Sequence, residues 1–173
     1  AELFHRLDSG QRPQTMIIAC ADSRADPSMI FDAAPGELFV LRNVAALVPP
    51  CEDDPGHHGV SAAIEFAVTG LKVRHILVMG HGGCGGVDAC LRMAEEGPVG
   101  KFIAPWVELA APARDAILAD ESIAPDQRHE ALEHAAVGQS ITNLSTFPFV
   151  AEALDAGALT INGAWFSIGK GEL

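Results

Sequence analysis

The chain has 173 residues, of which 49% are hydrophobic and 20% charged, and its formal net charge is −12 at pH 7. This length and composition are typical of a single globular domain, expected over residues 1–173, and exclude a disordered chain. The negative charge disfavours binding to nucleic acid, and no apolar run approaches the roughly 18 residues that cross a bilayer, so neither nucleic acid nor membrane is an expected partner.

The first half of the chain alternates between apolar runs and helical patterns. Short amphipathic or small-residue segments predict helices over residues 1–9, 27–31 and 59–71. Buried strands are predicted over residues 15–19, 37–43 and 75–80. Strands that alternate with helices in this way indicate a parallel sheet with right-handed crossovers.

Beyond residue 99 the pattern changes to helices, including residues 105–118 and 125–144, which prolines divide. The tail, residues 158–173, alternates like a strand and is expected to lie at the sheet edge. The predicted fold is therefore α/β: a mainly parallel central sheet, with four parallel strands plus a C-terminal edge strand, flanked by helices.

Two loops that follow predicted strands carry metal-binding side chains. Cys20 ends the first strand, and His81 and Cys84 follow the third with the spacing H-x-x-C. Because parallel strands end at the same edge of a sheet, both loops can reach one point. Two thiolates and an imidazole suit zinc, and three protein ligands leave a fourth position for water.

Spacing alone leaves other interpretations of these residues open. The thiols could be small buried side chains, or the site could be a structural zinc site whose fourth ligand is Asp22 or Cys51. Asp22 and Arg24 favour a catalytic site, because a carboxylate can orient water at a metal while a guanidinium holds it bidentately. Five glycines between residues 80 and 86 would let backbone N–H groups approach a small oxyanion.

The segments CADSR, PGELFVLRNVA, GHGGCGG and NGAWFSIGKGEL together resemble the β-class carbonic anhydrases, from about Gly10 to the C-terminus. The resemblance implies the β-carbonic anhydrase fold and a zinc-dependent lyase that reversibly hydrates CO2 to bicarbonate through a zinc-bound hydroxide. It implies Zn2+ on Cys20, His81 and Cys84. It also implies that the Asp22–Arg24 pair gates the fourth position, which Asp22 itself would occupy in a closed state.

The resemblance also implies an active site at an interface between two chains, in a homodimer or homotetramer. Gln11 would hydrogen-bond substrate, Phe39 and Val44 would form an apolar pocket for CO2, and the Gly85 N–H would contact the bound oxygen. Phe66 lines this pocket where many members have Tyr. The N-terminal arm, through which family members embrace a partner chain, is expected to be short.

Other positions bear on regulation and proton transfer. Arg42 matches the Arg of a family allosteric site, but Ile17 stands at its Trp position and the chain has no Tyr, so a form without that site is expected. His57 and His58 are either solvated loop residues or groups that pass protons to buffer. The cysteine content favours a cytoplasmic protein. The other Cys, Trp and His side chains are expected to be structural or surface residues: Cys51, Cys90, Trp106, Trp165, His5, His75, His129 and His134.

Two further functions remain open. Carbonyl sulfide and carbon disulfide hydrolases resemble the same family, and their substrates share the linear shape of CO2. A non-catalytic zinc-binding or redox-sensing protein would use Cys20 and Cys84 as a structural or oxidisable pair. The latter role needs neither the Asp22–Arg24 pair nor Gln11.

Overall fold

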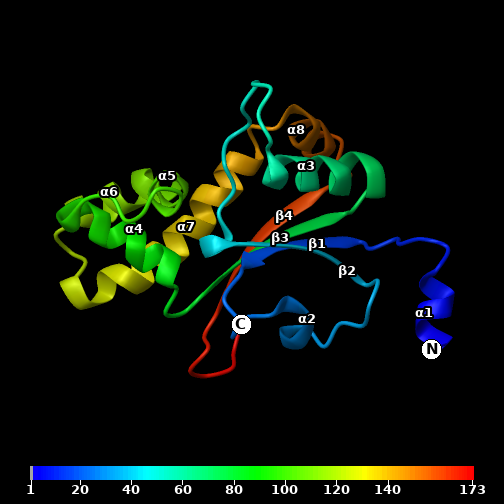
Figure 1. Cartoon of the computed structure of the whole chain (residues 1–173), viewed down its shortest axis with the longest axis horizontal. Helices are drawn as coiled ribbons and strands as arrows, with labels where there is room; N and C mark the ends of the chain where they lie inside the picture. The colour runs from blue at the N-terminus through cyan, green and yellow to red at the C-terminus, as the bar shows by residue number, and fades with distance from the viewer. Residues whose placement is uncertain (1) are drawn as a thin grey trace.

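The computed structural model describes residues 2–173 and has a parallel sheet at its centre (Figure 1). Its strands are β1 (Thr15–Cys20), β2 (Leu38–Asn43), β3 (His75–His81) and β4 (Thr160–Phe166), in the order β2-β1-β3-β4. All neighbouring strands are parallel, so the α/β class is confirmed, and the predicted C-terminal edge strand is the fourth parallel strand. Ala1, which the predicted helix and domain included, lies outside the described residues.

Eight α-helices surround the sheet within residues 2–173. They are α1 (Glu2–Leu7), α2 (Pro27–Ile30), α3 (Gly59–Glu65), α4 (Gly85–Glu96), α5 (Ile103–Val107), α6 (Ala111–Ala119), α7 (Arg128–Leu144) and α8 (Pro148–Asp155). The helix expected over residues 59–71 continues past α3 as a π-helical turn, Phe66–Leu71. The helix expected over residues 105–118 is divided because Pro112 lies in the first turn of α6. Among these residues no helix is long and apolar enough to span a membrane.

The strands bury both faces, as their near-continuous apolar sequences predict. Met16 and Ile18 of β1 face a core that includes Val137 of α7, whereas Ile17 and Ala19 face the opposite side. This alternation follows from the two-residue period of a strand. Figure 1 shows α3, α7 and α8 on one side of the sheet and α2 on the other.

Helices α4, α5 and α6 form a second group beside α7 (Figure 1). Their apolar side chains build a separate core cluster with α7, which includes Val87, Val107 and Leu132. Cys20 and Cys84 belong to this same cluster. The ends of β1 and β3 therefore meet the helical group at one place, and the candidate site lies there.

Candidate metal centre

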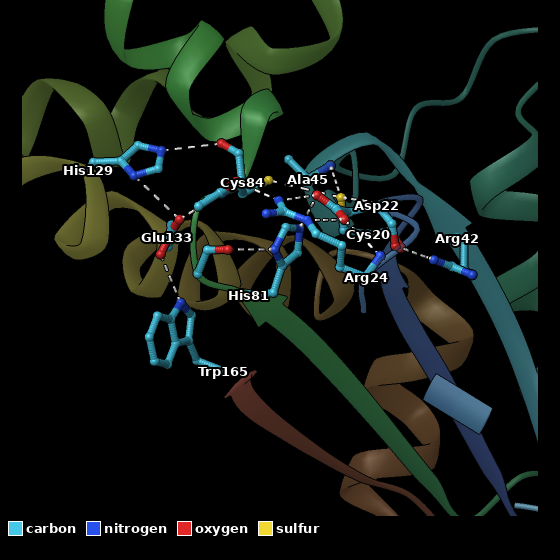
Figure 2. Close-up of polar contacts among 12 residues, drawn as sticks. Cys20, Asp22, Arg24, Arg42, Ala45, His81, Cys84, His129, Glu133 and Trp165 are labelled. Atoms are coloured by element: carbon cyan, nitrogen blue, oxygen red, sulfur yellow. Dashed lines mark hydrogen bonds and ion pairs between the residues drawn. The ribbon is translucent and has the colours of Figure 1, made fainter. Parts of the chain in front are cut away.

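The three predicted metal ligands come together at the carboxyl ends of the central strands (Figure 2). Cys20 and His81 are the last residues of β1 and β3, and Cys84 immediately precedes α4. Their ligand atoms all lie within 4.8 Å of one another, and all three side chains are buried. The two sulfur atoms are 4.0 Å apart.

The imidazole of His81 is oriented for a ligand. Its Nδ1 lies 3.0 Å from the carbonyl oxygen of Gly82, which can only accept, so Nδ1 carries the proton and Nε2 presents its lone pair. This Nε2 is buried and has no hydrogen-bond partner among the residues that the structure describes. A buried polar atom without a partner is costly, and a metal ion would supply the partner. The donor set of two sulfurs and one imidazole nitrogen fits zinc.

The electrostatics of the two thiols also fit a cation. The adjacent thiol of Cys84 lowers the pKa of Cys20 although burial opposes this, and N–H groups of Asp22 and Ala45 also point at its sulfur, at 3.4 and 3.3 Å. The same contact and burial raise the pKa of Cys84, because two negative charges would lie side by side. A divalent cation supplies the positive charge that a second buried thiolate needs.

Asp22 stands beside the ligands and is held by Arg24. The guanidinium donates two hydrogen bonds to the carboxylate, from Nε to Oδ1 at 2.9 Å and from Nη2 to Oδ2 at 2.7 Å. These bonds hold the pKa of Asp22 well below its usual range, so the carboxylate is ionised at neutral pH. Oδ2 lies 3.8 Å from Nε2 of His81, too far for a hydrogen bond. The predicted Asp22–Arg24 pair is therefore formed in this structure.

Arg42, on β2, forms hydrogen bonds with the same loop. It donates from Nε to the carbonyl of Cys20 at 2.9 Å and from Nη2 to the carbonyl of Asp22 at 2.6 Å, and it pairs with Asp26 at 2.7 Å. The sequence alone relates Arg42 only to a family allosteric site and does not indicate these contacts. Its place opposite Ala19 in the sheet register explains how it reaches these carbonyls.

A left-handed turn, Val44–Ala46, lies against the metal site. Ala45 and Ala46 have φ values of 64° and 54°, which non-glycine residues rarely adopt. The turn is held by the Trp106 Nε1–H, which donates to the Val44 carbonyl at 2.8 Å. Gly86 is required beside it, since a Cβ there would lie 2.6 Å from a methyl carbon of Val44. Trp106 was expected to be only a core or interface aromatic, so this polar role was missed.

The structure divides the predicted substrate residues into two groups. Val44 and Gly85 lie next to the metal ligands, at the turn and at the first residue of α4. Phe39 is near the start of β2, about 13 Å along the strands from the level of Cys20. Phe66 contacts Phe39, with ring centroids 5.9 Å apart, and Gln11 precedes β1. Within one chain these three residues lie away from the metal ligands.

Two other predicted candidates lie outside the site. Cys51 is exposed and does not group with the three ligands, so the structure does not support it as a fourth ligand. His57 and His58 line a separate pocket of about 350 Å³, together with Trp106. A hydrogen bond from the His58 ring to the carboxylate of Asp54 raises the pKa of His58.

The comparisons with known proteins agree with this geometry. The carbonic anhydrase family model matches residues 15–173. The chain is 36% identical over 167 residues to beta carbonic anhydrase 5 of Arabidopsis thaliana, a protein described as chloroplastic. That match covers 96% of this chain and 55% of the relative, so the chain spans about half the length of the curated relative.

Solved structures give the same result. The β-carbonic anhydrase CcaA has 30% identity and a TM-score of 0.88, with 98% of this chain and 76% of that chain covered. A tetrameric β-carbonic anhydrase from Sordaria macrospora has 31% identity and a TM-score of 0.83, with 98% and 83% covered. The family match, the shared fold and the buried Cys–His–Cys cluster show that this chain belongs to the β-class carbonic anhydrase family.

Proposed function

We propose that this chain catalyses the reversible hydration of CO2 to bicarbonate, with zinc held by Cys20, His81 and Cys84. The observation that supports this most strongly is the ionised carboxylate of Asp22, which Arg24 holds beside the three ligand atoms, with Oδ2 at 3.8 Å from Nε2 of His81. A structural metal site has no need of such a group. The relatives are also named as carbonic anhydrases.

Zinc, when bound, would supply a nucleophile by lowering the pKa of a water molecule. Asp22 would accept a hydrogen bond from that water and so orient it toward the substrate carbon. Val44 would offer an apolar surface to uncharged CO2. Gly85 would donate its N–H to a substrate oxygen, and the open space where its Cβ would stand leaves room for this approach.

A second copy of the chain would complete the pocket with Gln11, Phe39 and Phe66. Apolar side chains are exposed near these residues, with Phe66 at 52% and Val40 of β2 at 37% exposure. A partner chain that covers the Phe66 ring would remove this apolar surface from water. We infer a homodimer or homotetramer, in line with the tetrameric relatives from Sordaria macrospora.

The domain would span the whole chain. Residues 1–173 would act as one carbonic anhydrase domain, since residues from both halves of the chain share the same sheet and cores. The cytoplasmic location stays a prediction, because the Arabidopsis relative is chloroplastic.

The second candidate function is hydrolysis of carbonyl sulfide or carbon disulfide at the same site. Both substrates are linear, so the Asp22–Arg24 geometry would serve them as it serves CO2. A non-catalytic zinc or redox protein is disfavoured because it needs no ion pair there. Stopped-flow hydration of CO2 by protein of known zinc content, compared with turnover of carbonyl sulfide, tests the choice.

A further inference from the structure

His129 and Glu133 lie one turn apart on α7, and together they contact both backbone polar groups of Cys84 (Figure 2). The Cys84 N–H donates to Oε1 of Glu133 at 2.9 Å. Nε2 of His129 lies 3.2 Å from the Cys84 carbonyl oxygen, and its Nδ1 lies 3.5 Å from Glu133 Oε1. The backbone N–H and C=O of the metal ligand Cys84 therefore both have a partner on α7.

Packing alone does not explain a carboxylate at this position. Glu133 is 3% exposed, and its neighbours on the buried face of α7, Leu132 and Ala136, are apolar. Burial of a carboxylate costs free energy unless hydrogen bonds compensate. Within residues 2–173 no Lys or Arg forms an ion pair with Glu133, so the compensation comes from N–H donors.

The second oxygen of Glu133 has its own fixed donor. Nε1–H of Trp165, on β4, donates to Oε2 at 3.0 Å. The indole ring in turn stacks on His134, with centroids 4.8 Å apart. Each carboxylate oxygen of Glu133 therefore accepts from a separate N–H group. These two hydrogen bonds fix the orientation of the carboxylate.

The loop before Cys84 is held by contacts with residues from other elements, such as the hydrogen bond from the Gly82 N–H to the Phe166 carbonyl. Two glycines separate Cys84 from His81, and Gly83 has a φ of 67°. The carbonyls on either side of Cys84 have other partners, since Gly83 accepts from Arg24 and Cys84 accepts from the Asp88 N–H of α4. The Cys84 N–H has Glu133 as its acceptor, so the orientation of this peptide group depends on α7. Partners that orient a metal ligand raise metal affinity without touching the ion.

We propose that Glu133 and His129 are positioning residues that orient Cys84 for zinc, and that Trp165 orients Glu133. This inference rests on the proposed zinc site but not on the identity of the substrate. Neither α7 residue needs to reach a metal ion or a reacting atom. The effect passes through the Cys84 backbone.

The test is Glu133→Gln, with zinc affinity measured by competition with a chromogenic chelator. An amide has only one acceptor oxygen, so it can satisfy either Cys84 or Trp165 but not both. We expect zinc affinity to fall about 10- to 100-fold. The visible spectrum of the Co2+-substituted protein should also change, which a general loss of stability would not cause. Glu130→Gln, the same change at an exposed position of α7, should leave affinity and spectrum as in the wild type.

A second substitution tests whether Trp165 competes with Cys84 for the amide oxygen of Gln. Combining Glu133→Gln with Trp165→Phe removes the competing donor, so the amide oxygen can turn to the Cys84 N–H. The double variant should recover most of the lost zinc affinity. If Glu133→Gln does not fold, His129→Ala serves instead, because this side chain is 33% exposed. It should lower zinc affinity several-fold.

The outcomes separate this inference from the proposed function. Wild-type protein that binds zinc, with variants that bind it equally and give the same Co2+ spectrum, would overturn the role of Glu133 and His129 alone. Wild-type protein that binds no zinc would overturn the proposed function instead. Weaker binding in Glu133→Gln with no recovery in the double variant would overturn the part assigned to Trp165.

Discussion

The backbone N–H of Ala45 lies 3.3 Å from Sγ of Cys20, although 25 residues separate them in the sequence. The contact depends on the left-handed conformation of Ala45, which a relaxed turn would not adopt. Two hydrogen bonds from other elements stabilise this conformation. The Trp106 Nε1–H donates to the Val44 carbonyl, and the Ser140 hydroxyl donates to the Ala46 carbonyl. The turn is therefore part of the metal site.

Trp106→Phe should destabilise this turn. The ring remains apolar and aromatic, but the partly buried Val44 carbonyl loses its donor, which should cost about 1 kcal/mol. Urea unfolding would measure the change in the free energy of unfolding. Phe102→Leu, at a neighbouring side chain that is 80% exposed, should change it by less than about 0.5 kcal/mol. Equal stability of the two variants would mean that Trp106 does not hold the turn.

Arg24→Ala should lower activity without loss of zinc. The carboxylate of Asp22 would lose both guanidinium hydrogen bonds and could turn into the fourth ligand position, where it excludes water. We expect CO2 hydration to fall about 100-fold, with zinc content unchanged. Arg92→Ala is the matched control, since it breaks an arginine–carboxylate pair on the exposed surface of α4. Full activity in Arg24→Ala would refute the gating role.

The pH profile of hydration should rise from pH 6.5 to 9. The folded-state pKa of Asp22 lies below its unfolded value, so the ion pair is lost only as pH falls through that low pKa and does not titrate in this range. Two thiolates would cancel the charge of Zn2+, so its bound water should be less acidic than at an all-histidine site. Arg92→Ala changes neither the metal ligands nor Asp22, so this variant should show the same rise. A flat profile between pH 6.5 and 9 would contradict this assignment of the ligands.

Mixed assemblies test whether two chains share each site. One chain would carry Gln11→Ala and Phe39→Ala, and the other Cys84→Ala, so that each parent dimer is inactive. In a mixed dimer one of the two sites would contain no substitution, and random pairing should restore about a quarter of wild-type activity. Activity no higher than the mean of the parents would show that one chain supplies the whole site.

The sheet and the ligand cluster could be predicted because they follow from local patterns. Apolar runs identified β1 and β3, and parallel strands necessarily end at one edge. Cys20 and the His81–Cys84 spacing therefore had to converge, and the structure brings their ligand atoms together. Helix boundaries were less exact, as at the π-helical turn after α3, because tertiary packing decides how a helix ends.

The supporting residues could not be found in this way. Glu133 lies 49 residues after Cys84, and an acidic residue one turn from His129 is typical of an exposed helix. Only the docking of α7 against β3 and β4 turns it inward. The hydrogen bonds of the Trp106 and Trp165 indole N–H groups could not be predicted either, because the sequence does not show where the polar atom of an aromatic residue points. Gln11, Phe39 and Phe66 followed from the family resemblance alone.

The most direct test is stopped-flow CO2 hydration between pH 6.5 and 9, on protein whose zinc content has been quantified, with Asp22→Ala as the comparison. We expect fast turnover that rises with pH and falls by 100-fold or more in the zinc-loaded variant. Full zinc occupancy with negligible CO2 turnover in the wild type would contradict the proposed substrate. Turnover of carbonyl sulfide by the same sample would then identify the alternative.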